Sequence, residues 1–167
     1  MAERPQAFRF EEDEAIPNSR FPLLLYRRAI DPARADADAF ERLFDANGWG
    51  NGWRDGIYPF HHYHSTAHEV LGIARGRARV QFGGESGRPL DVAAGDAVVI
   101  PAGVGHKRLL ASSDLLVVGA YPPGQDWDLM RGRPGERPDA DRRIAAVPLP
   151  ETDPVMGAGG PLLTLWR

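Results

Sequence analysis

The chain has 167 residues, which is the length of one domain with a substantial buried core. Its net charge of −3 argues against the basic character of nucleic-acid-binding domains, so we expect no nucleic-acid partner. It contains no cysteine, which excludes disulfide bonds and thiolate metal sites. No apolar run is long enough to span a membrane, so we expect no membrane partner and a cytoplasmic location.

The first 52 residues are expected to form an N-terminal arm and one helix. In the arm, the short apolar runs at residues 8–10 and 23–26 are typical of strands. Proline residues separate the two runs, which indicates an extended and irregular segment between them.

The helix is predicted over residues 32–46. Asp31 is suited to cap its N-terminus, Pro32 to occupy its first position, and Asn47-Gly48 to end it. Helical spacing predicts one apolar face, made of Ala33, Ala37, Phe40 and Phe44.

Between about residues 53 and 121 the chain consists of short apolar runs separated by glycine and proline. Residues 77–82 alternate between apolar and polar side chains, and Gly83-Gly84 marks a hairpin turn after them. Residues 97–100 and 115–118 are continuous apolar strands. Many short strands at such spacing indicate an all-β sandwich or barrel, whose core we expect over about residues 53–121.

Residues 122–167 are rich in proline and glycine and are expected to form an irregular C-terminal arm, closed by one strand at 162–166. Nothing indicates a second domain, so residues 1–167 are interpreted as one domain. Large apolar residues of the two arms are expected to pack on the barrel and on a partner subunit, which favours a homodimer. They are Phe8, Phe10, Trp127, Leu162 and Trp166.

All five histidines lie within residues 61–68 or at His106. His62 and His64 are two residues apart, which on a strand puts both rings on one face, about 7 Å apart along the chain. Glu69 adds a carboxylate, and imidazole with carboxylate is a common donor set for transition metals. The pattern predicts a metal site.

Strand alternation leaves one question open at this site. Glu69 is five residues after His64, so it falls on the opposite face of a straight strand. Either a turn or bulge at residues 65–67 resets the alternation, or His68 is the ligand in place of Glu69. His61 has the opposite alternation from the two ligand histidines and is expected to face out of the barrel.

The spacing resembles the two sequence motifs of the cupin superfamily. The first motif reads Gly56, five residues, His62-Tyr63-His64, four residues, Glu69, six residues, Gly76. The second reads Gly95, five residues, Pro101-Ala102-Gly103, two residues, His106, with Leu110 where the family has Asn. Because the family's Asn is not a ligand, this departure does not affect the expected metal site.

Residues 61–69, 101–106 and 135–138 are also similar to the YjlB-type bacterial single-domain cupins, a group without a characterised function. The resemblance implies a double-stranded β-helix, or jelly-roll barrel, with one N-terminal helix and irregular arms. It also implies a turn before the glutamate and a role for His68 outside the ligand set. The implied cofactor is one divalent transition metal ion (Fe, Mn, Ni, Zn or Cu), and its implied ligands are His62, His64, Glu69 and His106.

Strand alternation relative to the ligand histidines places further side chains in the same cavity. A guanidinium there needs an anionic partner, so Arg108 is expected either to pair with a protein carboxylate such as Glu69 or to bind an anionic substrate. Trp49 and Trp53 are candidates for the mouth of the cavity. The substrate-pocket candidates are Tyr58, Phe60, Arg108 and Leu110.

Three nitrogen ligands and one carboxylate leave one or two positions open on a five- or six-coordinate ion, as in catalytic metal sites. The favoured function is therefore a metal-dependent enzyme of the oxygenase or isomerase/lyase type. Its partner is a small molecule, which is anionic if Arg108 binds it. The alternative is a non-catalytic module that binds or senses a small ligand or a metal, because no general base stands out apart from the ligands.

Overall fold

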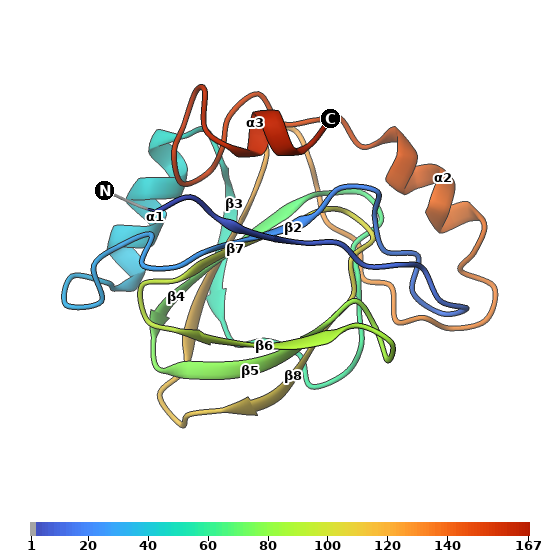
Figure 1. Ribbon diagram of the computed structural model, residues 1–167, viewed down its shortest axis with the longest axis horizontal. Helices are drawn as coiled ribbons and strands as arrows, with labels where there is room; N and C mark the ends of the chain where they lie inside the picture. Colours follow the sequence, from blue (N-terminus) through green and yellow to red (C-terminus); the bar gives the residue numbers. More distant parts are fainter. Residues whose placement is uncertain (1–2) are drawn as a thin grey trace.

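The computed structural model describes residues 3–167, which form two antiparallel β-sheets with helices on the outside (Figure 1). The strands are β1 (Gln6–Phe8), β2 (Leu23–Tyr26), β3 (Gly50–Asp55), β4 (Glu69–Arg75), β5 (Arg77–Phe82), β6 (Arg88–Ala93), β7 (Ala97–Ile100), β8 (His106–Ala111) and β9 (Leu116–Tyr121). The helices are α1 (Ala37–Ala46), α2 (Asp139–Ala146) and α3 (Leu162–Leu165). The larger sheet has the order β1-β2-β7-β4-β9-β3 and the smaller one β6-β5-β8, which confirms the predicted all-β fold.

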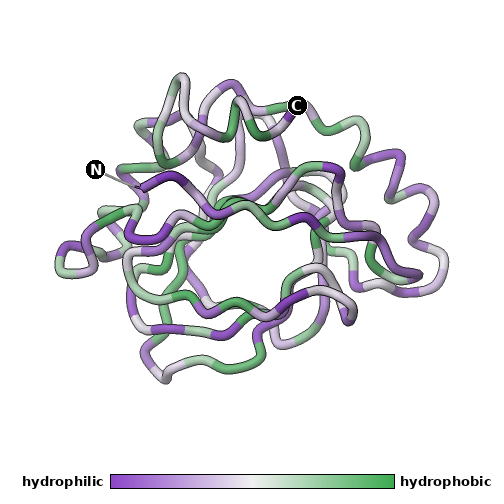
Figure 2. Tube along the Cα trace, in the orientation of Figure 1, coloured by the Kyte–Doolittle hydropathy of each residue, from purple (hydrophilic) through white to green (hydrophobic). Residues whose placement is uncertain are grey.

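Side-chain alternation divides the apolar residues between two cores. In β5, Val80 and Phe82 are buried inside the barrel while Arg77 and Arg79 are exposed, as the alternation predicted. A second core lies between the larger sheet and the segments that cover it, chiefly α1 and the C-terminal arm. Figure 2 shows apolar residues along β2 and β7 and mostly hydrophilic residues along α2. Each fully buried Val or Leu side chain stabilises the fold by about 1.5–3 kcal/mol.

Helix α1 begins later than predicted. Its N-cap is Asp36, whose side chain accepts a hydrogen bond from the Ala39 amide. Asp31 instead accepts from the Ala33 amide in a separate turn at residues 32–34, which leaves Ala33 exposed. The predicted start at residue 32 is therefore wrong, because two aspartates with capping geometry lie five residues apart and the second one starts the helix.

The C-terminal arm is more regular than predicted. It contains α2, and residues 162–166 form the short helix α3 and its C-cap in place of the predicted strand. Leu162 and Trp166 are both 1% exposed. They are four residues apart, so a helix turns both side chains onto one face. Pro161, just before them, is also suited to the start of a helix. The strand prediction failed because an apolar run this short fits either element.

A buried aspartate ties the C-terminal arm to the larger sheet. The Asp153 carboxylate is fully buried and accepts hydrogen bonds from the Tyr26 hydroxyl and from three amides of its own arm. Trp166 adds a second attachment, since its ring stacks on Phe21 at 5.6 Å and its indole nitrogen donates to the Pro22 carbonyl at 2.8 Å. The arm thus packs on its own barrel.

The N-terminal arm pairs with the sheet slightly earlier than predicted. Strand β1 covers Gln6–Phe8 rather than residues 8–10, and Phe10 lies beyond it against the barrel.

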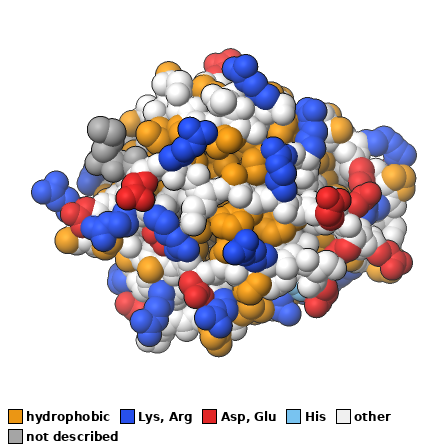
Figure 3. Space-filling view, viewed as in Figure 1, with side chains coloured by type: hydrophobic (Ala, Val, Ile, Leu, Met, Phe, Trp, Pro, Cys, Tyr) orange, Lys and Arg blue, Asp and Glu red, His pale blue; other side chains and the backbone are white. Residues whose placement is uncertain are grey.

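Within residues 3–167, no helix has both the length and the apolar character needed to cross a membrane. On the face shown in Figure 3, charged side chains of both signs are interspersed with apolar ones.

Candidate metal centre

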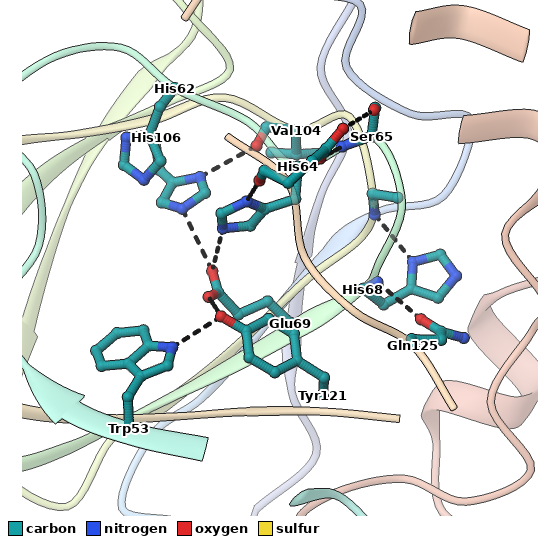
Figure 4. Close-up of polar contacts among 12 residues, drawn as sticks. Trp53, His62, His64, Ser65, His68, Glu69, Val104, His106, Tyr121 and Gln125 are labelled. Atoms are coloured by element: carbon teal, nitrogen blue, oxygen red, sulfur yellow. Dashed lines mark hydrogen bonds and ion pairs between the residues drawn. The ribbon is translucent and has the colours of Figure 1, made fainter. Parts of the chain in front are cut away.

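Three histidines converge inside the barrel (Figure 4). His106 is the first residue of β8, and His62 pairs with it through two backbone hydrogen bonds of 3.1 and 2.9 Å. His64 follows two residues after His62. One ring nitrogen of each histidine lies within 4.8 Å of the others, and all three residues are buried, so this triad is able to hold a metal ion.

Each of the three rings is oriented by a backbone carbonyl through its Nδ1 atom. A carbonyl oxygen only accepts, so each Nδ1 carries a proton. In the neutral ring each Nε2 is then left with a lone pair, the form in which imidazole binds metals. The pairs are His62 with Phe60 at 3.0 Å, His64 with Asp128, and His106 with Val104 at 3.2 Å.

Glu69 brings a carboxylate to the same point. It is the first residue of β4, and alternation with Leu71 and Ile73, which belong to the barrel core, turns it inward. Its Oε1 atom lies 3.4 Å from Nε2 of His64 and 3.4 Å from Nε2 of His106. This oxygen is buried and has no hydrogen-bond partner among the residues that the structure describes.

The donor set fits a divalent metal ion. Two ligands bound at about 2.1–2.2 Å and about 90–110° apart are separated by about 3.0–3.6 Å, and the observed nitrogen–oxygen separations of 3.4 Å lie in this range. Lone pairs and a carboxylate in such proximity repel one another unless a proton or a metal ion lies among them. A buried oxygen without a partner is also costly, and a metal ion satisfies it. Three nitrogens and one carboxylate suit a transition metal.

The protonation states of the cluster are coupled. Burial and the neighbouring His106 lower the pKa of His62, which keeps that ring neutral. Burial also lowers the pKa of His64, but the Glu69 carboxylate outweighs it, so the net pKa of His64 is raised. Burial opposes the ionisation of Glu69, yet His64 and His106 hold the pKa of its carboxyl well below the usual range. A metal ion therefore competes at this centre with a proton on His64.

The chain leaves strand geometry between His64 and Glu69. Ser65 lies in a bend, where its amide and hydroxyl both donate to the Asp128 carboxylate, the amide at 2.6 Å. This bend resets the side-chain alternation, which accounts for the five-residue offset between the two ligand candidates. Asp128 therefore holds both the bend, through its side chain, and the His64 ring, through its carbonyl.

His68 and His61 both lie outside the cluster. Nδ1 of His68 accepts a hydrogen bond of 2.9 Å from the Ala102 amide, and its ring packs on Trp166 with 4.8 Å between centroids. Burial lowers the pKa of His68 to about 4. His68 thus contacts the C-terminal arm rather than the point where the ligands meet. His61 points to the surface, with Nε2 2.9 Å from a carboxylate oxygen of Glu85.

The cluster opens onto a cavity of about 490 Å3, which Arg108 lines but Leu110 does not. Arg108 pairs with Val80, whose side chain faces the interior, whereas Leu110 pairs with the outward Arg79 and is 64% exposed. A bulge in β8 adds one residue, Leu109, between the two pairs and shifts the alternation. The prediction for Leu110 is wrong for this reason.

The predictions that Phe60 and Trp49 lie at the cavity are also wrong. Tyr58 lines the cavity, but Phe60 does not, because its ring lies near the Tyr58 ring at 4.8 Å and near the Arg131 guanidinium at 3.7 Å. Residues 57–61 are not a strand, so strand alternation does not apply there. Trp53 lines the cavity as expected, whereas Trp49 is buried in the core beneath α1.

Sequence reasoning missed two aromatic residues of the cavity, Tyr121 and Trp127. The Tyr121 hydroxyl donates to Oε2 of Glu69 at 2.8 Å and accepts from the Trp53 indole nitrogen at 2.7 Å. Tyr121 is the last inward-facing residue of β9, so strand alternation in the sequence could have placed it in the cavity. The Trp127 ring lies 5.6 Å from the His64 ring but belongs to an irregular segment, for which the sequence offers no such signal.

Comparison with known proteins identifies the family. A family model described as "Cupin domain" matches residues 55–117. The "Uncharacterized protein YjlB" of Bacillus subtilis is 45% identical over 167 residues, which are 99% of each chain. The chain is a cupin of the YjlB family. The resemblance expected from the two motifs is confirmed, and the two antiparallel sheets of this cupin are consistent with the jelly-roll fold.

Solved structures with a similar fold have more distant sequences. An acireductone dioxygenase from Bacillus anthracis, with a cadmium ion in its active centre, is 14% identical over 56% of this chain and 62% of its own, with a TM-score of 0.40. A single-residue mutant of oxalate decarboxylase from Bacillus subtilis is 18% identical over 71% of this chain and 30% of its own, also with a TM-score of 0.40. Likenesses at this level carry no information about the site of this cupin.

Proposed function

We propose that this cupin is a metal-dependent enzyme that acts on a small molecule. It binds one divalent transition metal ion through His62, His64, Glu69 and His106. The observation that carries the proposal is the buried Oε1 atom of Glu69, which faces two histidine nitrogens at 3.4 Å and has no other partner within residues 3–167. Its carboxylate needs a positive charge at this point, and a metal ion supplies it by displacing the proton of His64.

The cavity supports a catalytic role for the metal ion rather than a purely structural one. Four protein ligands leave one or two positions open, and the cluster faces a space of about 490 Å3 rather than packed side chains. When bound, the ion supplies Lewis-acid polarisation of a substrate oxygen or, if it is redox-active, activation of dioxygen. The reaction is accordingly of the oxygenase or the isomerase/lyase type.

The surrounding side chains have separable roles in this proposal. Tyr121 holds one oxygen of Glu69 and so directs the other toward the histidines. Trp53 and Trp127 narrow the space from which water and substrate approach the centre. The carbonyl partners of the three rings keep each Nδ1 protonated and each Nε2 ready to bind.

The test begins with metal content. Protein reconstituted with Fe(II), Mn(II), Ni(II) or Zn(II) is assayed for bound metal and then incubated with a panel of small carboxylic acids in an oxygen electrode, with NMR of the products. Oxygen uptake with product supports an oxygenase, and product without oxygen uptake supports an isomerase or lyase. Binding without any product supports the binding or sensing module instead. Protein that retains no metal contradicts the proposal.

A further inference from the structure

We infer that the cavity of this cupin takes an aromatic carboxylate, with its carboxylate on Arg108 and its ring against Tyr58 and Trp127. The inference rests on the proposed function, because it names the substrate class of the same cavity. It is carried by three observations, namely an arginine without a partner, an aromatic rim and a third aromatic side chain locked into the wall.

Arg108 is the cation of the cavity that no protein group neutralises. Among the cavity-lining residues of the described chain, it is the one lysine or arginine. Its guanidinium makes no ion pair or side-chain hydrogen bond within residues 3–167, although Asp55 and Glu69 line the same space. A guanidinium stays charged and matches a carboxylate through two parallel hydrogen bonds. Half-buried and two residues from His106, it is positioned to hold a ligand beside the metal centre.

The two carboxylates that line the cavity favour a ligand with a single negative charge. A bound divalent ion and Arg108 together carry three positive charges, against two negative charges on Asp55 and Glu69. One positive charge is left for a ligand to balance. The charges of the cavity therefore fit a monocarboxylate better than a phosphate ester.

Two aromatic rings form the rim of the cavity. Tyr58 is 46% exposed and Trp127 is 43% exposed, which is high for side chains of this size. Tyr58 meets the His62 ring edge-on at 5.2 Å, and Trp127 meets the His64 ring at 5.6 Å. Each ring therefore lies against a metal-binding histidine candidate and keeps exposed surface that a bound ligand with a flat apolar body would cover.

Trp53 makes the wall rigid. Its indole lies on the backbone of β9, where a Cβ atom at Gly119 would come within 2.2 Å of its Cε2 atom. The indole nitrogen is held by the Tyr121 hydroxyl at 2.7 Å. A flat, fixed wall of this kind suits the face of an aromatic ring.

The probes are benzoate, benzamide, acetate and inorganic phosphate, titrated by calorimetry into the Mn(II)-loaded protein. We expect benzoate to bind at least tenfold more tightly than each of the other three. Arg108→Gln is expected to weaken benzoate at least tenfold and to change benzamide less than twofold, since a hydrogen bond to a charged group is worth about 1.5–3 kcal/mol. Trp127→Ala is expected to weaken benzoate and benzamide alike.

The controls separate this inference from the proposed function. Arg77→Gln removes the same charge from an exposed position of β5 and is expected to leave benzoate affinity unchanged. Arg108→Lys keeps the charge but loses the planar fork, so its benzoate affinity is expected to fall between wild type and Arg108→Gln. Mn(II) affinity is measured first in every variant, and its absence in the wild type contradicts the proposed function. Intact Mn(II) binding with acetate or phosphate equal to benzoate, or with no effect of Arg108→Gln, overturns the aromatic carboxylate.

Discussion

The hydroxyl of Tyr121 donates a hydrogen bond of 2.8 Å to Oε2 of Glu69. The same hydroxyl accepts from the Trp53 indole at 2.7 Å, so its proton is directed to the carboxylate. This contact occupies one oxygen of Glu69 and leaves the other facing His64 and His106. The orientation of the carboxylate is therefore set from behind by the last residue of β9.

Removing that hydroxyl is expected to weaken metal binding without abolishing it. Tyr121→Phe keeps the ring and the four ligands but frees the Glu69 carboxylate to rotate. Loss of such a supporting hydrogen bond typically lowers metal affinity about 10–100-fold. Calorimetric titration with Mn(II) measures this loss at unchanged stoichiometry. Tyr58→Phe, which alters the cavity rim, is the control, and equal affinities for the two variants would refute the role of Tyr121.

Metal binding is expected to release protons near neutral pH. Burial lowers the pKa of His64, but the Glu69 carboxylate outweighs it and raises the net pKa, so in the metal-free protein this ring keeps its proton to a higher pH than a free imidazole does. A metal ion displaces that proton, so the number of protons released per ion decreases as the pH rises through the pKa of His64, and metal affinity falls as the pH falls. Titrations in buffers of different ionisation enthalpy count the protons. Release that is independent of pH would disprove this coupling.

The ligand candidates were predictable because each lies near the end of a regular strand or inside a motif of fixed spacing. Alternation in β5 also predicted which of its side chains are buried. The offset between His64 and Glu69 pointed to a bend that the structure contains at Ser65. Such features depend on residues that are close together in the sequence, so the spacing of those residues is enough to predict them.

Other features depend on contacts between distant segments. The bulge at Leu109 that turns Leu110 outward arises from the pairing of β8 with β5, and nothing in the local sequence marks it. Trp127 reaches the cavity because Asp128 is bonded to the bend at Ser65. Such long-range pairings are not visible as periodicity in the sequence.

Packing of α1 on β4 is expected to tolerate no added volume at Gly72. A Cβ atom there would lie 2.4 Å from Cδ1 of Phe40, whose side chain is fully buried, so the ring or the backbone must shift. Gly72→Ala is expected to lower the free energy of unfolding by about 1–3 kcal/mol in urea denaturation. Gly50→Ala, where nothing lies within 4 Å of the added atom, is the control and is expected to change it by less. A stable Gly72→Ala protein would show that α1 packs differently.

The homodimer stays a prediction with a narrower basis. Leu162 and Trp166, which favoured a partner subunit, are buried within the chain itself. Leu109 and Leu110 of β8 remain 41% and 64% exposed and are the apolar pair that a second copy would cover. Sedimentation is expected to give about twice 18.3 kDa and to shift to the monomer in Leu110→Lys but not in Leu149→Lys, a control at a similarly exposed leucine. A wild-type monomer at micromolar concentration would contradict the prediction.

The metal centre is tested most directly by the metal stoichiometry of two histidine variants. His106→Ala removes a ligand candidate, whereas His61→Ala removes a histidine that pairs with Glu85 at the surface. Calorimetric titration with Mn(II), checked by elemental analysis, is expected to give one ion per chain for the wild type and His61→Ala. For His106→Ala we expect binding at least a hundredfold weaker. Stoichiometric, unweakened binding by His106→Ala, or no binding by the wild type, would contradict the account.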